Sequence, residues 1–86
     1  MKIYASTSLD PALSTLCERA LINEEFTTHA MAADGGIISF VSEGVTYVAV
    51  LEIGDIDGEG NALMIAAVHP VGAEGLEAVL ADVMAG

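Results

Sequence analysis

The most distinctive chemical pattern in this chain is an acidic, glycine-rich segment, residues 55–61, which reads Asp-Ile-Asp-Gly-Glu-Gly-Asn. Acids at the first, third and fifth places and glycine at the sixth match the start of an EF-hand calcium loop. The twelfth place, where such a loop needs a bidentate Glu, holds Ala66. The flanking residues favour strands rather than helices. We therefore expect a solvated hairpin loop without a specific metal, whose glycines supply the positive φ that turns need.

Cys17, His29 and His69 could also do chemistry, either as a Cys–His nucleophile pair or as metal ligands. Cys17 lies on an apolar helical stripe, where a buried and inert thiol is usual. The two histidines form no short ligand spacing such as His-x-x-x-His. A single cysteine also excludes an internal disulfide and a cysteine-based zinc cage. We expect no catalytic residue, no metal site and no cofactor.

Motifs for phosphate binding or hydrolysis are not found in the sequence. The glycines at positions 54, 58 and 60 are in the wrong order for a dinucleotide fingerprint, and no Lys follows them as in a phosphate-binding loop. Because Lys2 and Arg19 are the only Lys or Arg residues, an anionic substrate would lack charged anchors. The sequence therefore predicts a protein that is not an enzyme.

Two amphipathic helices are predicted around the segments that carry these residues. Asp10 is a good N-cap and Pro11 suits the first helical position, so the first helix begins here and ends near residues 23–25. The second runs from about Ala73 to Met84. Both carry apolar residues with the helical period: Ala12, Leu13, Leu16, Cys17, Ala20 and Leu21 in the first, and Leu76, Val79, Leu80, Val83 and Met84 in the second.

Strand patterns occupy the rest of the chain: a short strand at residues 3–5, then strands at 26–32, 37–42, 45–53 and 62–68. Turn residues separate them, namely Asp34-Gly35-Gly36, Glu43-Gly44 and the loop at 54–61, and Pro70 ends the last strand. Short connections make consecutive strands antiparallel neighbours. The sequence predicts one α+β domain over residues 1–86, in the order β-α-β-β-β-β-α. A four- to five-stranded antiparallel meander sheet, with residues 45–53 at its centre, packs against two amphipathic helices.

The predicted central strand is apolar on both sides, with alternate residues from Val45 to Ile53 on one side and Thr46, Val48, Val50 and Glu52 on the other. In the last strand, strict alternation groups Leu63, Ile65 and Ala67 on one face and Met64, Ala66 and Val68 on the other. A half-exposed antiparallel strand should alternate more cleanly. Two explanations remain open: one helix covers each face, or both helices share one face while the other meets a partner or a second copy.

The charge is the strongest departure from an average composition: 13 acids against 2 Lys or Arg give a net charge of −11. So few cations exclude direct binding of DNA or RNA through phosphates. No apolar run reaches the roughly 18 residues of a membrane-spanning helix. The first residues lack the apolar core of a secretory signal, so we expect a cytoplasmic protein.

The acidity has two explanations. Net charge keeps an apolar small protein soluble, but a negative surface also steers association and selects a basic partner. The candidate contact surface combines acids around the long hairpin loop with two acids of the last helix: Glu52, Asp55, Asp57, Glu59, Glu74 and Glu77.

In size, acidity and lack of catalytic motifs, the whole chain resembles phage-encoded anti-CRISPR proteins. The resemblance implies an inhibitor that occupies the basic nucleic-acid-binding surface of a CRISPR effector complex, a ribonucleoprotein, in the bacterial host cytoplasm. Small acidic immunity proteins and antitoxins that plug nucleases are similar for the same physical reason. Two alternatives from other classes remain. One is a homo-oligomeric structural or assembly protein, for example of a phage particle. A homodimer is the smallest assembly of this kind. The other is a small ligand-binding or metal-responsive regulator.

Overall fold

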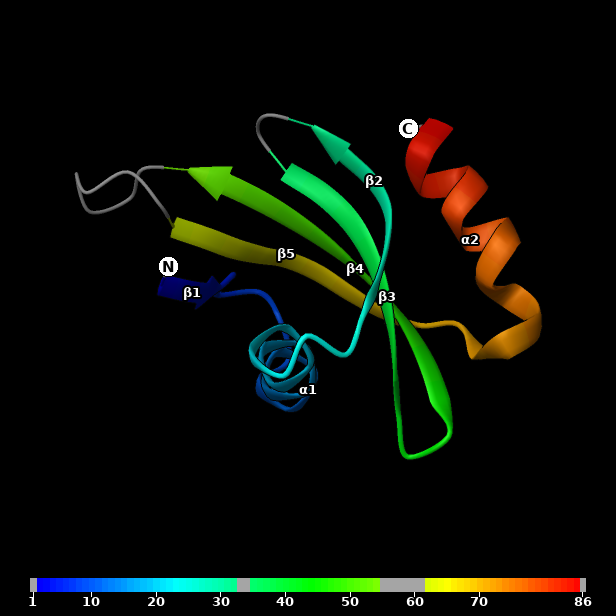
Figure 1. Ribbon diagram of the computed structural model, residues 1–86, viewed down its shortest axis with the longest axis horizontal. Helices are drawn as coiled ribbons and strands as arrows, with labels where there is room; N and C mark the ends of the chain where they lie inside the picture. Colours follow the sequence, from blue (N-terminus) through cyan, green and yellow to red (C-terminus); the bar gives the residue numbers. More distant parts are fainter. Residues whose placement is uncertain (1, 33–34, 55–61, 86) are drawn as a thin grey trace.

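The computed structural model describes residues 2–32, 35–54 and 62–85 of the chain (Figure 1). The fold is α+β, in the predicted order β-α-β-β-β-β-α. The elements are β1 (Lys2–Ala5), α1 (Pro11–Ile22), β2 (Thr27–Ala32), β3 (Gly35–Ser42), β4 (Val45–Gly54), β5 (Ala62–Pro70) and α2 (Gly72–Ala85). Each element lies within a few residues of its predicted position.

The five strands form one sheet in the order β1-β5-β4-β3-β2, so β4 is the central strand as predicted. Strands β2 to β5 form an antiparallel meander. The predicted meander of four to five strands thus has four, and β1 makes the sheet mixed, because it pairs parallel to β5 from Lys2↔Ala62 to Ala5↔Ile65. The cause is α1, because this helix carries the chain from the β1 edge of the sheet to the β2 edge. A tight turn would instead have made β1 and β2 antiparallel neighbours.

Helix α1 has capping interactions at both ends. The Asp10 carboxylate accepts a hydrogen bond of 2.8 Å from the Ala12 backbone N–H, and Pro11 occupies the first turn. At the other end Glu24 adopts a left-handed conformation, φ 57°. The Glu25 N–H then bonds the Ala20 carbonyl oxygen at 2.9 Å, a pairing typical of a Schellman cap. These caps direct the chain from α1 into β2.

The hairpin between β3 and β4 turns at Glu43 and Gly44, as predicted. Both residues have positive φ, 51° and 79°, which is the geometry of the two-residue turns that suit twisted antiparallel strands. The other predicted turn differs, because Gly35 and Gly36 belong to β3 rather than to the turn before it. A Cβ on Gly35 would collide with the Leu51 backbone carbonyl oxygen of β4. The pair of glycines therefore allows close contact between strands.

The two helices lie on opposite sides of the sheet (Figure 1). Cys17 and Ala20 of α1 are buried in one core cluster with sheet residues that include Ile38, Ala49 and Ile65. Val48, next to Ala49 on the opposite pleat, is fully buried but lies outside that cluster, and α2 packs against β4. One helix therefore lies on each face, as in the first of the two explanations, but α2 accounts for the burial of Val48 and not for every apolar residue of its face.

A β-bulge in β5 corrects the predicted faces of this strand. Leu51 pairs with Ile65 but Val50 pairs with Ala67, so Ala66 is the extra residue. Beyond the bulge the alternation is inverted. Val68 joins Leu63 and Ile65 in the α1 core, and Ala67 faces the other side. Strict alternation could not reveal this shift, because all residues from 62 to 68 are apolar.

Candidate functional site

The structure separates the described members of the predicted acidic contact surface. Glu52 lies near the end of β4, whereas Glu74 lies in the first turn of α2 and Glu77 one turn later. Helix α2 starts beside the beginning of β4, where the Val71 N–H bonds the Thr46 carbonyl oxygen at 2.8 Å. Thr46 and Glu52 are six residue steps apart along the strand, about 20 Å. Asp55, Asp57 and Glu59 lie outside the described residues, so the partner-binding role of all six acids stays a prediction.

In the described ranges, carboxylates are spread over the surface rather than gathered in one place. Nine of the 13 acids lie in the part of the chain that the structure describes, and the side chains of all nine are exposed. They come from both helices, their flanking residues, one hairpin and the end of β4: Asp10, Glu18, Glu24, Glu25, Glu43, Glu52, Glu74, Glu77 and Asp82. Negative charge is therefore accessible to a partner from several directions.

A second surface lies on the sheet face against which α2 packs, in the half of that face that α2 leaves uncovered. Val48 lies at the α2 end and is fully buried, whereas residues farther along the same pleats are only half-buried. We call this half the open face and define it as Tyr4, Ile37, Val50, Glu52, Met64 and Ala66. These side chains point away from the α1 core because their strand neighbours, such as Ile38, Leu51 and Ile65, point into it.

Glu52 is the one charged residue among these six, and its carboxylate is exposed. Its cross-strand partners are Gly35 on β3 and Met64 on β5. Two shallow depressions meet at Glu52. One, of about 290 Å³, extends over Ile37 and Val50, and the other, of about 440 Å³, over Met64, Ala66 and Ser6. Neither depression is enclosed, so the geometry suits a surface contact more than the capture of a small molecule.

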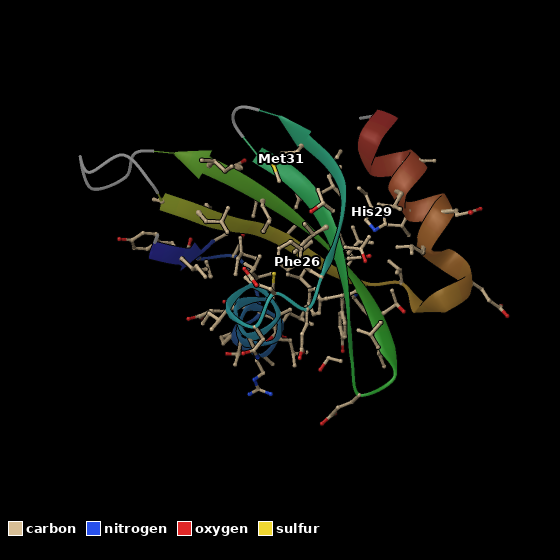
Figure 2. The ribbon with its side chains drawn as sticks, viewed as in Figure 1. Phe26, His29 and Met31 are labelled. Atoms are coloured by element: carbon tan, nitrogen blue, oxygen red, sulfur yellow. The ribbon has the colours of Figure 1, made fainter. Side chains whose placement is uncertain are left out.

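The structure separates the two groups of the candidate Cys–His pair. The Cys17 thiol is fully buried between α1 and the sheet, and burial raises its pKa from 9.0 to about 12. His29 lies on the other face, between β2 and α2 (Figure 2). Cys17 is thus a neutral packing residue, as its place on the apolar stripe of α1 predicts.

His29 has a partner that the sequence did not reveal. A hydrogen bond of 2.6 Å joins its Nε2 atom to the Oγ atom of Ser39 on β3. Ser39 is buried, 7 % exposed, so its hydroxyl is closed to a substrate although a Ser–His pair can act as a nucleophile. The pair depends on a register shift between Thr28 and Ala30, which makes His29 the extra residue of β2. Its role is to satisfy a buried hydroxyl in the layer under α2.

Two further features of residues 2–32, 35–54 and 62–85 concern metal binding and membranes. Within these ranges no group of three His, Cys, Asp or Glu residues is arranged to hold a metal ion. No helix in the same ranges is long and apolar enough to cross a bilayer. The calcium-like segment 55–61 lies outside the described residues, so the expectation that it binds no specific metal stays a prediction.

Comparisons with protein-family models, curated proteins and solved structures gave no match to this chain. Its function therefore has to be argued from its surfaces, namely the dispersed carboxylates and the open face.

Proposed function

We propose that this protein is a non-enzymatic inhibitor that binds a basic, nucleic-acid-handling surface of another protein. In the form we favour, it is a phage anti-CRISPR protein that acts on a CRISPR effector complex in the bacterial host cytoplasm. The observation that carries the proposal is the charge. The chain has 13 acids against 2 Lys or Arg, and all nine acids in the described ranges are exposed.

The physical argument rests on electrostatic complementarity. A protein that binds DNA or RNA presents Lys and Arg side chains to phosphates. Exposed carboxylates attract the same side chains, and a net charge of −11 accelerates their encounter at low salt. An acidic protein bound there excludes the nucleic acid without doing any chemistry. An acidic immunity protein or antitoxin that plugs a nuclease would use the same attraction, so an inhibited nuclease is the corresponding alternative.

The test is a pair of charge-reversal variants with equal net charge. Asp55, Asp57 and Glu59 are changed to Lys in one variant, and Glu18, Glu24 and Glu25 in the other. Each variant carries a net charge of −11 + 6 = −5. The rate of association with a CRISPR effector complex is measured at low and physiological salt. If the predicted loop contact is right, the loop variant should associate about tenfold or more slowly than the control, because steering depends on charges near the contact.

Equal rates for the two variants would show that the loop acids act only through net charge and solubility. The contact would then lie elsewhere on the protein. Exposed charges contribute little to stability, so both variants should keep the parent's circular dichroism spectrum.

A homo-oligomeric assembly protein is the second candidate, because the open face is a half-buried apolar surface of the kind that a second copy can cover. Met31, with 61 % of its surface exposed on the edge strand β2, adds apolar surface on the α1 side of the sheet, since it pairs with Gly36 and Gly36 pairs with Leu51 of the α1 core. Sedimentation separates the two candidates. An assembly protein should show a mass that rises with concentration and depends little on salt, whereas the inhibitor should bind its partner in a salt-sensitive manner.

A further inference from the structure

The open face has the dimensions of a helix-binding surface. It crosses four neighbouring strands, β1, β5, β4 and β3, which span about 14 Å at ~4.8 Å per strand. An α-helix with its side chains is about 10 Å wide. On the same side of the sheet α2 already lies against β4, so the open face offers the place beside it.

The residues of the open face suit close contact with an apolar helix. Gly35 and Ala66 are small, while Ile37, Val50 and Met64 supply half-buried apolar surface around them. Burying such apolar surface contributes about 25 cal/mol per Å². The geometry thus favours a segment with an apolar stripe of helical period.

Glu52 determines which kind of helix fits. Its carboxylate lies within the apolar surface, and its cross-strand partners Gly35 and Met64 carry no charge. Of the chain's two Lys or Arg residues, Arg19 belongs to α1 on the other side, and Lys2 lies on the edge strand β1, two residues before Tyr4, which pairs with Met64. A second copy docked face to face would bring together two chains that each carry a net charge of −11 and would bury two Glu52 carboxylates, which is costly.

We propose that the open face binds an amphipathic helix of a basic protein partner, with the apolar stripe of that helix on Val50 and Met64 and a Lys or Arg paired with Glu52. This inference rests on the proposed function and specifies the contact surface. A hydrogen-bonded ion pair between Glu52 and this Lys or Arg depends on direction, so it also fixes the position of the partner helix on the open face. The dispersed carboxylates would then steer the basic partner, while the open face holds it.

The test uses a synthetic 18-residue peptide of Leu, Ala and Lys whose apolar residues recur with helical period, and a matched peptide with Glu in place of Lys. Backbone amide signals of the ¹⁵N-labelled protein are followed by NMR during titration. The Lys peptide should shift the signals of Ile37, Val50 and Met64 and leave those of Cys17 and Ala20 unchanged. The Glu peptide should bind at least about tenfold more weakly, because it places like charges together.

Variants of the protein provide the matched control. Glu52→Lys should weaken the Lys peptide about tenfold or more, and Glu52→Gln, which keeps the shape of the side chain, should weaken it less. Glu18→Lys makes the same change of net charge on α1 and should have less than about twofold effect. Circular dichroism checks that each variant is folded.

Several results would overturn the assignment: shifts that map to α1 or to the exposed side of α2, equal binding of the two peptides, equal effects of Glu52→Lys and Glu18→Lys, or no binding. Shifts of the open-face signals with protein concentration alone would also overturn it, in favour of a second copy. The proposed function is judged separately. If a CRISPR effector complex is inhibited while the peptide result fails, only the open-face assignment falls. If the peptide maps as expected but no nucleic-acid-handling complex is bound, the proposed function falls.

Discussion

Replacing Cys17 by Ala should change how the free energy of unfolding depends on pH. The thiol is fully buried, and burial raises its pKa from 9.0 to about 12. Above pH 9 the unfolded chain loses the thiol proton while the folded chain keeps it. The unfolded state then binds fewer protons, so the free energy of unfolding falls as the pH rises from about 9 to about 12. The Ala variant lacks this contribution.

The size of the effect follows from the two pKa values. Each pH unit between them lowers the free energy of unfolding by about 1.4 kcal/mol, which gives about 3 kcal/mol at pH 11. At pH 7 the Ala variant should be less stable than the parent by about 1 kcal/mol, because a small core truncation leaves a cavity. The two stability curves should therefore cross near about pH 9.6, and above it the variant should be the more stable protein.

The assay is urea denaturation of both proteins between pH 7 and pH 11, followed by circular dichroism in the presence of a reductant. The two proteins differ only at residue 17, so the difference between the curves isolates Cys17. Parallel curves would refute the reasoning. So would rapid labelling of Cys17 by a thiol reagent in the folded protein, because a buried neutral thiol reacts slowly.

Three further predictions concern stability, each measured by urea denaturation at pH 7. Gly35→Ala should lower the free energy of unfolding by about 1–3 kcal/mol, because the new Cβ would collide with the backbone of β4. Gly54→Ala is the control: its Cβ would meet open space, so the free energy of unfolding should change by less than about 1 kcal/mol. Equal effects of these two substitutions would contradict the close contact at Gly35. Gly75→Ala should raise the free energy of unfolding by about 1 kcal/mol, because Gly75 is helical and a Cβ there would meet no atom of another part of the protein within 4 Å. A loss of stability would mean that another part of the protein packs against Gly75. Asp10→Ala should lower the free energy of unfolding by about 1 kcal/mol, because the Ala12 N–H loses its capping hydrogen bond. An unchanged free energy of unfolding would show that this cap does not stabilise the protein.

Local signals were sufficient to predict most of the elements. Asp10-Pro11 marks the start of α1, and Glu43-Gly44 marks a two-residue turn, because capping and positive φ depend on residues close in sequence. The central position of β4 followed from its length and its apolar character on both sides. These features need no knowledge of distant parts of the chain.

Three features of strand pairing could not be predicted. The parallel pairing of β1 follows from the path of α1 across the sheet, and a four-residue strand carries no signal for its partner. The bulge at Ala66 is hidden within an apolar run, so Val68 was assigned to the wrong face. The hydrogen bond between His29 and Ser39 needs a second bulge and is equally invisible in the sequence.

The candidate site was predictable only in part. Acidity selected Glu52 together with loop and helix acids, but Glu52 and Glu74 lie at opposite ends of β4. The apolar partners of Glu52 on the open face, such as Ile37 and Met64, were not singled out. The apolar pattern of a strand indicates which residues lie on the same face of the sheet, but it does not indicate which of them α2 covers. That extent is a property of the packed structure.

The most direct test of the central claim is the binding of target DNA by purified CRISPR effector complexes, loaded with guide RNA, during titration with this protein. The account predicts that at least one complex loses DNA binding at a stoichiometric amount of the protein, and that raising the salt concentration relieves the inhibition, because the contact is electrostatic. If DNA binding by every complex is unchanged at a large molar excess of the protein in both low and physiological salt, the protein is not such an inhibitor.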